Sequence, residues 1–456
     1  MSVTIHPSSV SEREQPQALA TSDHHEDPVS QTKLGGSRAS RLVRTTLAPL
    51  QVPDFRLLFG GQMISTIGDM FYAVALPWLM LSSGRSPQEL GIVLAAYGVP
   101  RVGTLLVGGL LSDRLRPRRV MLLADLLRAL LVSALVVLAA GGQTAVWQLA
   151  AISAPLGACT GLFLPASYSI LPEVLDDAEL PAGNALNGST YQLAVLVGSA
   201  IAGVVVSLLR PAAALAVDAA TFAISAVTLL AMRGQSYTTR GSAVNRETTL
   251  EDAPTSSPFA PEITFWQLLR QWRLLHVGLV IMVCLNLTAG ALFEVALPSL
   301  AHGPFAAGAT GFGLLLAAFG VGALTGGLLG GGVGRLPRRG AIMLVLILAL
   351  AAFYPLVPFA GGLPGAMLVF AAAGIANGLL NVLFFIVTQQ LTPRHLLGRV
   401  MSVLMLANLG VYPLSVALGG LVTTHFGPAV LFVATGGLMA LASLSGWLEP
   451  EMRQLQ

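Results

Sequence analysis

Twelve long apolar stretches, separated by short polar loops, dominate this chain of 456 residues. Only 10% of the residues are Asp, Glu, Lys or Arg, whereas a soluble domain has about 25%. A helix needs roughly 20 apolar residues to cross a hydrocarbon core of about 30 Å. Lipid offers no partner to unpaired backbone groups, and the stretches lack strand-like alternation, so each is predicted to be a transmembrane helix.

These stretches predict an all-α membrane protein with 12 transmembrane helices in two pseudo-symmetric six-helix bundles, residues 51–233 and 267–449. Polar residues dominate the other segments: 1–50, expected to be a disordered cytoplasmic tail, 234–266, a cytoplasmic linker, and 450–456, a cytoplasmic C-terminal tail. The predicted spans are 56–82, 88–112, 119–140, 145–170, 184–209, 212–232, 274–300, 309–333, 340–360, 364–390, 399–423 and 428–448.

The distribution of cations predicts the orientation of these spans. With the N-terminus inside, the external loops hold only Arg85 and Arg210. Arg101 and Arg128 lie deep within spans, and the cytoplasmic segments, together with the span ends that border them, hold the other 21 of the 25 Lys and Arg residues. Lys and Arg accumulate in cytoplasmic loops, so both termini are expected in the cytoplasm. Anionic lipid headgroups account for the same cations, and no nucleic-acid partner is expected.

The two halves of the chain repeat each other. Gly108-Gly109-Leu110-Leu111 precedes a basic loop and recurs 218 residues later as Gly326-Gly327-Leu328-Leu329. Arg210-Pro211 and Gly427-Pro428, each joining two spans, are 217 residues apart. Duplicated halves of this kind place a binding site between them near the bilayer midplane, and such an architecture supports alternating access.

The loop after the second span reads Gly109-Leu110-Leu111-Ser112-Asp113-Arg114-Leu115-Arg116-Pro117-Arg118-Arg119. It resembles the signature loop of the major facilitator superfamily, in which Gly-x-Leu-x-Asp-Arg precedes a short basic run. Residues 50–448 are more similar still to the superfamily's bacterial exporter branch of enterobactin-exporter-like and macrolide-efflux-like proteins. That branch has Gly-Asp in the first span, here Gly68-Asp69, and a third-span motif like Leu122-Leu123-Ala124-Asp125-Leu126-Leu127-Arg128.

This resemblance implies a secondary transporter in the bacterial inner membrane, monomeric and surrounded by lipids. It implies proton-coupled export of amphipathic small molecules such as antibiotics, siderophores or related metabolites. A lysophospholipid or lipid flippase and a nutrient-uptake permease of the same fold stay open as alternatives. The sequence has no nucleotide-binding loop, paired-His helix, Cys-x-x-Cys or Gly-x-Ser-x-Gly, so we expect no cofactor, no metal site and no enzymatic activity.

The resemblance also suggests a gate at the cytoplasmic surface. In the superfamily, the carboxylate that corresponds to Asp113 is thought to face the N-terminal end of span 11, here near Gly398-Arg399. A helix dipole attracts such a group by roughly 0.3–1 kcal/mol at an exposed site, a scale suited to a latch that breaks in each cycle. The alternative interpretation is that the arginines only set the orientation of the helices in the membrane. The gating candidates are Gly109, Asp113, Arg114, Arg118, Arg119, Asp125 and Arg128.

Several charged residues fall inside the predicted spans. An ionisable side chain at the bilayer centre costs at least about 2.5–3.5 kcal/mol, so each requires a partner or a function. Asp69 and Arg101 are expected at similar depth, and with Glu294 they are the candidates for proton coupling. The alternatives are a permanent Asp69–Arg101 pair and, for Glu294, an outer carboxylate paired with an arginine or His302. Asp218 is expected to cap a helix or pair internally.

Polar and aromatic side chains recur at helical spacing within the spans. Amides in lipid must be paired or face water, so these residues either join helices or line a pathway. For the two aromatic residues Phe71 and Tyr168, core packing is the competing interpretation. The candidates for the substrate cavity are Gln62, Phe71, Tyr168, Asn187, Tyr191, Gln192, Asn377, Asn381, Asn408 and Tyr412.

Overall fold

The computed structural model describes residues 47–142, 144–233, 273–333, 337–391, 404 and 406–454. The predicted linker 234–266, residues 1–46 of the predicted tail and the last two residues therefore lie outside the description. Throughout the described ranges the regular structure is helical, without a strand. The helices of both halves belong to one unit of the chain, Thr46–Gln456.

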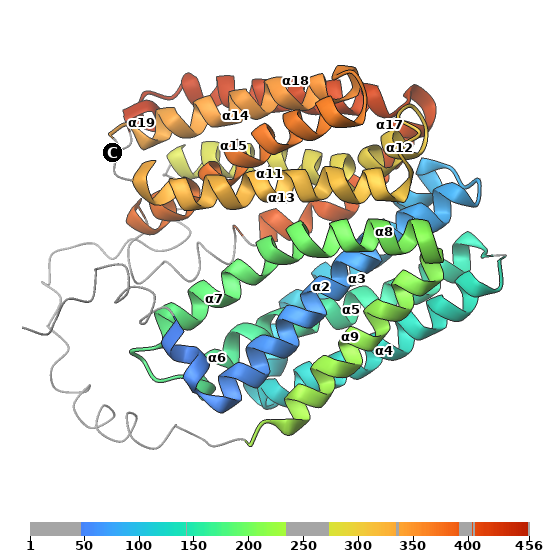
Figure 1. The fold of residues 1–456 in the computed structure, drawn as a ribbon. Helices are drawn as coiled ribbons and strands as arrows, with labels where there is room; N and C mark the ends of the chain where they lie inside the picture. The colour runs from blue at the N-terminus through green and yellow to red at the C-terminus, as the bar shows by residue number, and fades with distance from the viewer. Residues whose placement is uncertain are drawn as a thin grey trace, which may run out of the picture. The chain divides into compact units, whose positions relative to one another are not determined.

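The first half of the chain supplies six spans, the fifth of which contains a π-helical segment (Figure 1). Several of these helices start at a proline, which fits the first turn because that turn leaves backbone N–H groups unpaired. The elements are η1 (Ala48–Gln51), α2 (Pro53–Ser82), α3 (Pro87–Arg114), α4 (Pro117–Ala140), α5 (Val146–Ser169), α6 (Leu171–Val174), α7 (Leu180–Leu193), η2 (Ala194–Gly198), α8 (Ser199–Leu209) and α9 (Pro211–Ala231).

The second half has the same plan, with a π-helical segment in its first span. The elements are α11 (Arg273–Gly290), η3 (Ala291–Ala296), α12 (Leu297–His302), α13 (Gly308–Val333), α14 (Arg339–Leu356), η4 (Val357–Phe359), α15 (Leu363–Leu391), α17 (Tyr412–Phe426), α18 (Pro428–Trp447) and α19 (Pro450–Gln454).

The observed spans match the predicted fold class. Eleven helical segments among the described residues are long and apolar enough to cross a membrane. The remaining predicted span, 88–112, is the 28-residue helix α3, which carries Glu89 and Arg101. The predicted start of span 11 at residue 399 lies outside the described ranges, and the helix continues to Phe426. The prediction of an all-helical, twelve-span protein is confirmed.

Small residues allow the helices within each half to approach closely. A Cβ on Gly157 of α5 would lie 1.9 Å from the carbonyl oxygen of Tyr97 in α3, so no side chain fits there. In the second half, a Cβ on Gly322 of α13 would lie 2.0 Å from the carbonyl oxygen of Ala371 in α15. Close backbone contact of this kind is a main source of helix association in lipid.

The two halves also meet at one end of the spans, which we call the contact end: the end at which Ser82, Leu209, His302 and Phe426 lie (Figure 1). The backbone N–H of Gln88 donates to Thr424 Oγ1 at 2.8 Å. Between α13 and α8, Thr310 Oγ1 donates to Ser207 Oγ at 2.8 Å. The indole of Trp78 packs edge-on against the ring of His302, with 5.2 Å between centroids. These contacts join α3 to α17, α8 to α13 and α2 to α12.

The sequence repeat reappears in the backbone at the corners before Pro211 and Pro428. Arg210 has φ 73° and ψ 162°, and Gly427 has φ 84° and ψ 162°. This region of φ/ψ space is almost restricted to glycine because a Cβ clashes there. The duplicated corner therefore holds a glycine in one half and a strained arginine in the other.

A buried polar network joins α4 to α9 in the first half. Arg128 Nη2 donates to Asp125 Oδ1 at 2.7 Å, and Ser225 Oγ of α9 donates to Asp125 Oδ2 at 2.7 Å. The guanidinium lies between the rings of Phe163 and Phe222, 4.1 and 4.6 Å from their centroids. The side chains of Arg128 and Asp125 are only 2% and 0% exposed, so solvent does not screen this pair. It fastens helices inside the first half.

Replacing Arg210 by glycine tests the strained corner. We expect Arg210→Gly to raise the free energy of unfolding by about 1 kcal/mol, since release of roughly 1–3 kcal/mol of backbone strain exceeds the 0.4–1 kcal/mol, roughly, by which glycine favours the unfolded chain. The matched change Gly427→Ala should destabilise the protein. The measurement is the thermal unfolding midpoint in detergent. Equal losses in both variants would show that Arg210 is not strained.

The buried network predicts a second difference in stability. Asp125→Ala leaves Arg128 buried without its carboxylate, which costs about 3–5 kcal/mol. The control is Glu89→Gln, because the Arg85–Glu89 pair is 38% and 33% exposed and such pairs contribute about 0–1 kcal/mol. The apolar double variant Asp125→Leu/Arg128→Met should recover most of the loss. Thermal unfolding of Asp125→Ala that matches the control would contradict a structural role for the pair.

Candidate functional site

A cavity of about 200 Å³ lies at mid-height, where the two halves face each other. Helices α2, α3, α5 and α7 of the first half and η3 and α17 of the second half form its wall. The lining side chains are mixed, with three charged groups among aromatic and apolar ones. They are Thr66, Asp69, Met70, Tyr72, Ala73, Leu76, Pro77, Leu94, Tyr97, Arg101, Thr160, Tyr191, Glu294 and Tyr412.

The cavity brings together the three charged residues that the sequence singled out. Asp69 and Arg101 come from the first half and Glu294 from the second, and all three are half-buried. Glu294 accepts a hydrogen bond from the hydroxyl of Tyr412. No hydrogen bond or ion pair joins Asp69 to Arg101 among the described residues, and Arg101 Nε has no hydrogen-bond partner there. His302, the alternative partner of Glu294, packs on Trp78 instead.

Four tyrosines surround these charges. Tyr191 and Tyr412 are among the predicted cavity residues, whereas Tyr72 and Tyr97 were missed by sequence reasoning. Helical spacing offered a signal for both, because Tyr72 follows Asp69 by three residues and Tyr97 precedes Arg101 by four. The rings of Tyr72 and Tyr97 lie 6.1 Å apart, and the Arg101 guanidinium lies 5.8 Å from the centroid of the Tyr97 ring.

A side chain from α17 explains the π-helical segment η3 that carries Glu294. The hydroxyl of Ser415 accepts a hydrogen bond from the N–H of Ala291 at 2.8 Å and donates one to the carbonyl of Leu287 at 2.5 Å. In an α-helix, that N–H and that carbonyl would bond to each other. An inserted hydroxyl of this kind widens a helical turn, and π-helical turns are frequent at functional sites. Ser415 and Tyr412 thus position Glu294 from the same helix.

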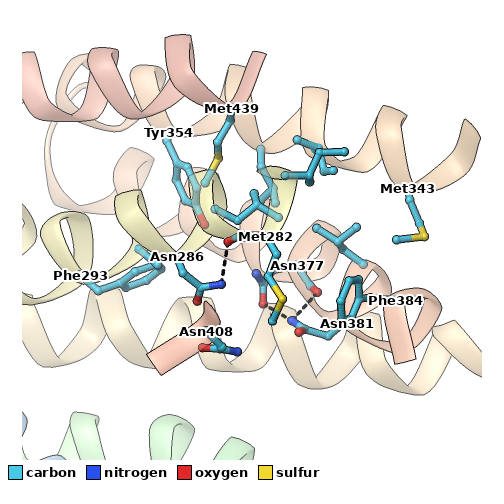
Figure 2. A pocket seen from close by; sticks show the side chains of 16 residues that line it. Met282, Asn286, Phe293, Met343, Tyr354, Asn377, Asn381, Phe384, Asn408 and Met439 are labelled. Carbon is cyan, nitrogen blue, oxygen red and sulfur yellow. Dashed lines mark hydrogen bonds between the residues drawn. The ribbon is translucent and has the colours of Figure 1, made fainter. Parts of the chain in front are cut away.

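A second cavity, of about 140 Å³, lies within the second half (Figure 2). Helices α11, α14, α15 and α18, the segment η3 and Asn408 line it, and none of the described residues that line it is charged. Asn381 Nδ2 donates to the backbone carbonyl and to Oδ1 of Asn377, both at 2.9 Å. Asn286 Nδ2 donates to the carbonyl of Met282 at 2.9 Å. The predicted cavity residues Asn377, Asn381 and Asn408 therefore belong to a neutral pocket, apart from the charged one.

The other predicted cavity residues line neither of these two cavities. Phe71 is 4% exposed and packs in the core, in agreement with its alternative interpretation, and Tyr168 is 52% exposed. The backbone carbonyl of Gln62 accepts a hydrogen bond from Thr66 Oγ1 at 2.7 Å. Asn187 and Gln192 are half-buried on the fifth span.

The predicted gating residues have different surroundings. Gly109, Asp113 and Arg114 belong to α3, but the side chains at its end are not among those described, and Gly398-Arg399 lies outside the described residues. Arg119 is exposed. Arg118 donates from Nε to the carbonyl of Leu229 at 2.8 Å and from Nη2 to that of Leu230 at 3.1 Å. It thereby satisfies carbonyls at the end of α9 that have no partner within the helix.

Comparison with known proteins agrees with this architecture. The multidrug efflux pump Tap of Mycolicibacterium fortuitum is 26% identical over 422 residues, which covers 91% of this chain and 98% of that protein. The multidrug efflux pump Tap of Mycobacterium tuberculosis is 27% identical over 420 residues, covering 88% and 94%. A solved POT family transporter in complex with 5-aminolevulinic acid has a TM-score of 0.68 at 13% identity, covering 87% and 96%.

The sequence profile of the Major Facilitator Superfamily matches residues 58–408 and, in a second match, 279–454. Together these matches include both six-helix halves and the cavity between them. The chain belongs to the Major Facilitator Superfamily and is a multi-pass, non-enzymatic membrane transporter.

Proposed function

We propose that this transporter exports amphipathic small molecules, cationic drugs among them, in exchange for protons by alternating access. The observation that carries the proposal is the central cavity, in which carboxyl groups of both halves, Asp69 and Glu294, face one space. The efflux pumps that resemble the chain over most of its length support the export direction.

The charges around the cavity suggest how exchange works. Two carboxylates and one guanidinium leave one excess negative charge when all three groups are ionised. One proton or one monovalent cation neutralises this excess, so the two ligands compete for the site. Competition of this kind couples the movement of one to the opposite movement of the other. The tyrosine rings offer aromatic faces to a cationic substrate, an attraction of about 0.5–2 kcal/mol.

The contact end is proposed to face the outside. The basic loop of residues 114–119, the start of α2 and the end of α18 belong to the other end, and cations accumulate on the cytoplasmic side. In this orientation the present arrangement brings the two halves together on the external side. We propose Asp113 as a latch on the cytoplasmic side in the opposite state, and the asparagine-lined second cavity as a contact for uncharged parts of a substrate.

Proteoliposomes that contain the purified protein test the exchange. With ethidium, a fluorescent amphipathic cation, and an imposed proton gradient, we expect uphill transport that falls at least about tenfold in Asp69→Asn and in Glu294→Gln. Each variant removes a carboxylate that can bind the exchanged proton or cation, and a hydrogen bond to a charged group is worth roughly 1.5–3 kcal/mol. Glu173→Gln, an exposed carboxyl away from the cavity, is the control.

Wild-type uphill transport in Asp69→Asn would remove that carboxyl from the coupling mechanism. A fluorescent lysophospholipid serves as the second substrate in the same vesicles. Its transfer between leaflets, without any transport of ethidium, would replace the drug-export proposal by the flippase alternative.

Alternating access also predicts that the contact end separates. A Cβ on Gly91 would lie 2.5 Å from the carbonyl oxygen of Val416, whereas a Cβ on Gly103 of the same helix meets nothing within 4 Å. Gly91→Val should therefore weaken the contact by roughly 1–3 kcal/mol, and Gly103→Val should not. The readout is disulfide formation between Gln88→Cys and Thr424→Cys after both native cysteines are replaced by serine.

We expect the yield of this crosslink to fall about tenfold in Gly91→Val, which corresponds to about 1.4 kcal/mol, and to stay unchanged in Gly103→Val. Equal yields in the two variants would show that the glycine contact does not hold the halves together.

A further inference from the structure

A buried carboxyl group lies behind the wall of the central cavity. Asp218 of α9 is 1% exposed, and neither of its side-chain oxygens has a hydrogen-bond partner within the described part of the chain. The sequence predicted that Asp218 caps a helix or pairs internally, and among the described residues it does neither. A carboxylate without a partner in an apolar interior is costly, so this group calls for a proton or for a function.

Asp218 is placed against the segment that carries Asp69. A Cβ on Gly68 of α2 would lie 2.8 Å from Asp218 Oδ1 and 1.9 Å from Thr221 Oγ1. Only glycine leaves room for the Asp218 carboxyl at this point of α2. The next residue along the chain is Asp69, which lines the central cavity. The two carboxyl groups therefore flank one turn of α2, Asp69 on the cavity side and Asp218 on the buried side.

The charged groups around Asp218 can be counted element by element. Helix α9 packs against α2, α4 and α8. Helix α8 has no titratable residue, and the other two helices contribute Asp69 and Arg128. The rest are engaged elsewhere or lie toward the helix ends: Asp54, Arg56, Tyr72, Arg118, Arg119 and Asp125.

The interior of the first half then has one negative charge too many. Its carboxyls are Asp69, Asp125 and Asp218, and its cations are Arg101 and Arg128. Arg128 is bonded to Asp125, although its Nε has no partner. One proton bound to this group of five restores neutrality within the first half, and Glu294 of the second half, which faces the same cavity, needs a proton of its own. Because Asp125 already has two hydrogen bonds, the proton of the first half belongs to Asp69 or Asp218.

We propose that Asp69 and Asp218 form a carboxyl pair that shares one exchangeable proton, the coupling proton of the transport cycle. When a cationic substrate enters the cavity from the cytoplasm, the proton moves from the Asp218 carboxyl to the Asp69 carboxylate and then to cytoplasmic water, so that the charge of the substrate replaces that of the proton. The Asp218 carboxylate then faces Arg128. After the substrate leaves to the outside, a proton from external water binds Asp69 and passes to Asp218, which restores the first state. This inference rests on the proposed proton exchange, but its first test does not.

Infrared spectroscopy of the purified protein tests the pair without any transport. In a Glu294→Gln background at neutral pH, we expect a band from one protonated carboxyl group. Both Asp69→Asn and Asp218→Asn should abolish this band, because each leaves two carboxylates opposite two guanidinium groups. A band that persists in Asp69→Asn would show that Asp218 holds its proton alone, and absence of the band from the background protein would refute the bound proton. Either result overturns the proposal.

Transport by Asp218→Asn tests the role of the pair. This change preserves the size of the side chain, and a thermal unfolding midpoint like that of the wild type shows that the variant folds. We expect normal ethidium binding and normal ethidium counterflow, which moves no net proton, but proton-driven uphill transport no faster than in protein-free liposomes. Wild-type uphill transport would overturn the proposal.

If Asp218→Asn does not fold, Asp218→Glu takes its place, and we expect this variant to retain proton-driven transport. Loss of proton-driven transport in a folded Asp218→Glu protein would count against the pair.

Discussion

The cost of an unpaired charge in an apolar interior underlies most of what is unusual in this transporter. The first half encloses three carboxyls and two guanidinium groups, and they are handled in three ways. Asp125 and Arg128 bind each other and bridge α4 to α9 through Ser225. Asp69 and Arg101 face a cavity, where water or a ligand can solvate them. Among the described residues Asp218 has neither a bonded partner nor a place in the cavity wall, so packing alone does not explain it.

Close backbone contact is the second constraint, and it acts both within and between the halves. Inside the halves, glycines let α5 approach α3 and α15 approach α13 until carbonyl oxygens occupy the space of a side chain. Between the halves, Gly203 of α8 and Gly313 of α13 face each other in the same manner, as do Gly91 of α3 and Gly420 of α17. At these points backbone meets backbone, without an intervening side chain.

The cavity depends on both constraints at once. Ser415 opens one turn of the helix that carries Glu294 by taking the place of a backbone hydrogen bond, while Tyr412 on the same helix bonds the Glu294 carboxyl. Tyr412 also packs against Gly98 of α3, so one residue of the second half touches both the charged cavity and the first half. A change of charge at Glu294 is therefore positioned to influence the contact between the halves.

The sequence by itself determined the fold class, because hydropathy and length leave few alternatives to a bundle of membrane helices, and the repeat at 217 or 218 residues indicated two related halves. It also identified Asp69, Arg101 and Glu294 as charges that need an explanation. Asp125 and Arg128 are three residues apart, a spacing that places both on one helical face. These are properties of single segments of the chain, so the local pattern of residues is enough to predict them.

Only the tertiary structure decided which of these residues meet. Tyr72 and Tyr97 join the charged cavity, Asn377, Asn381 and Asn408 line a separate neutral one, and Phe71 packs in the core. The insertion of Ser415 into a helix 124 residues away in the sequence, and the position of Asp218 against Gly68, depend on how helices from distant segments pack. Helical spacing gives the face of each residue, but the neighbouring helix determines whether that face meets water, lipid or another charge.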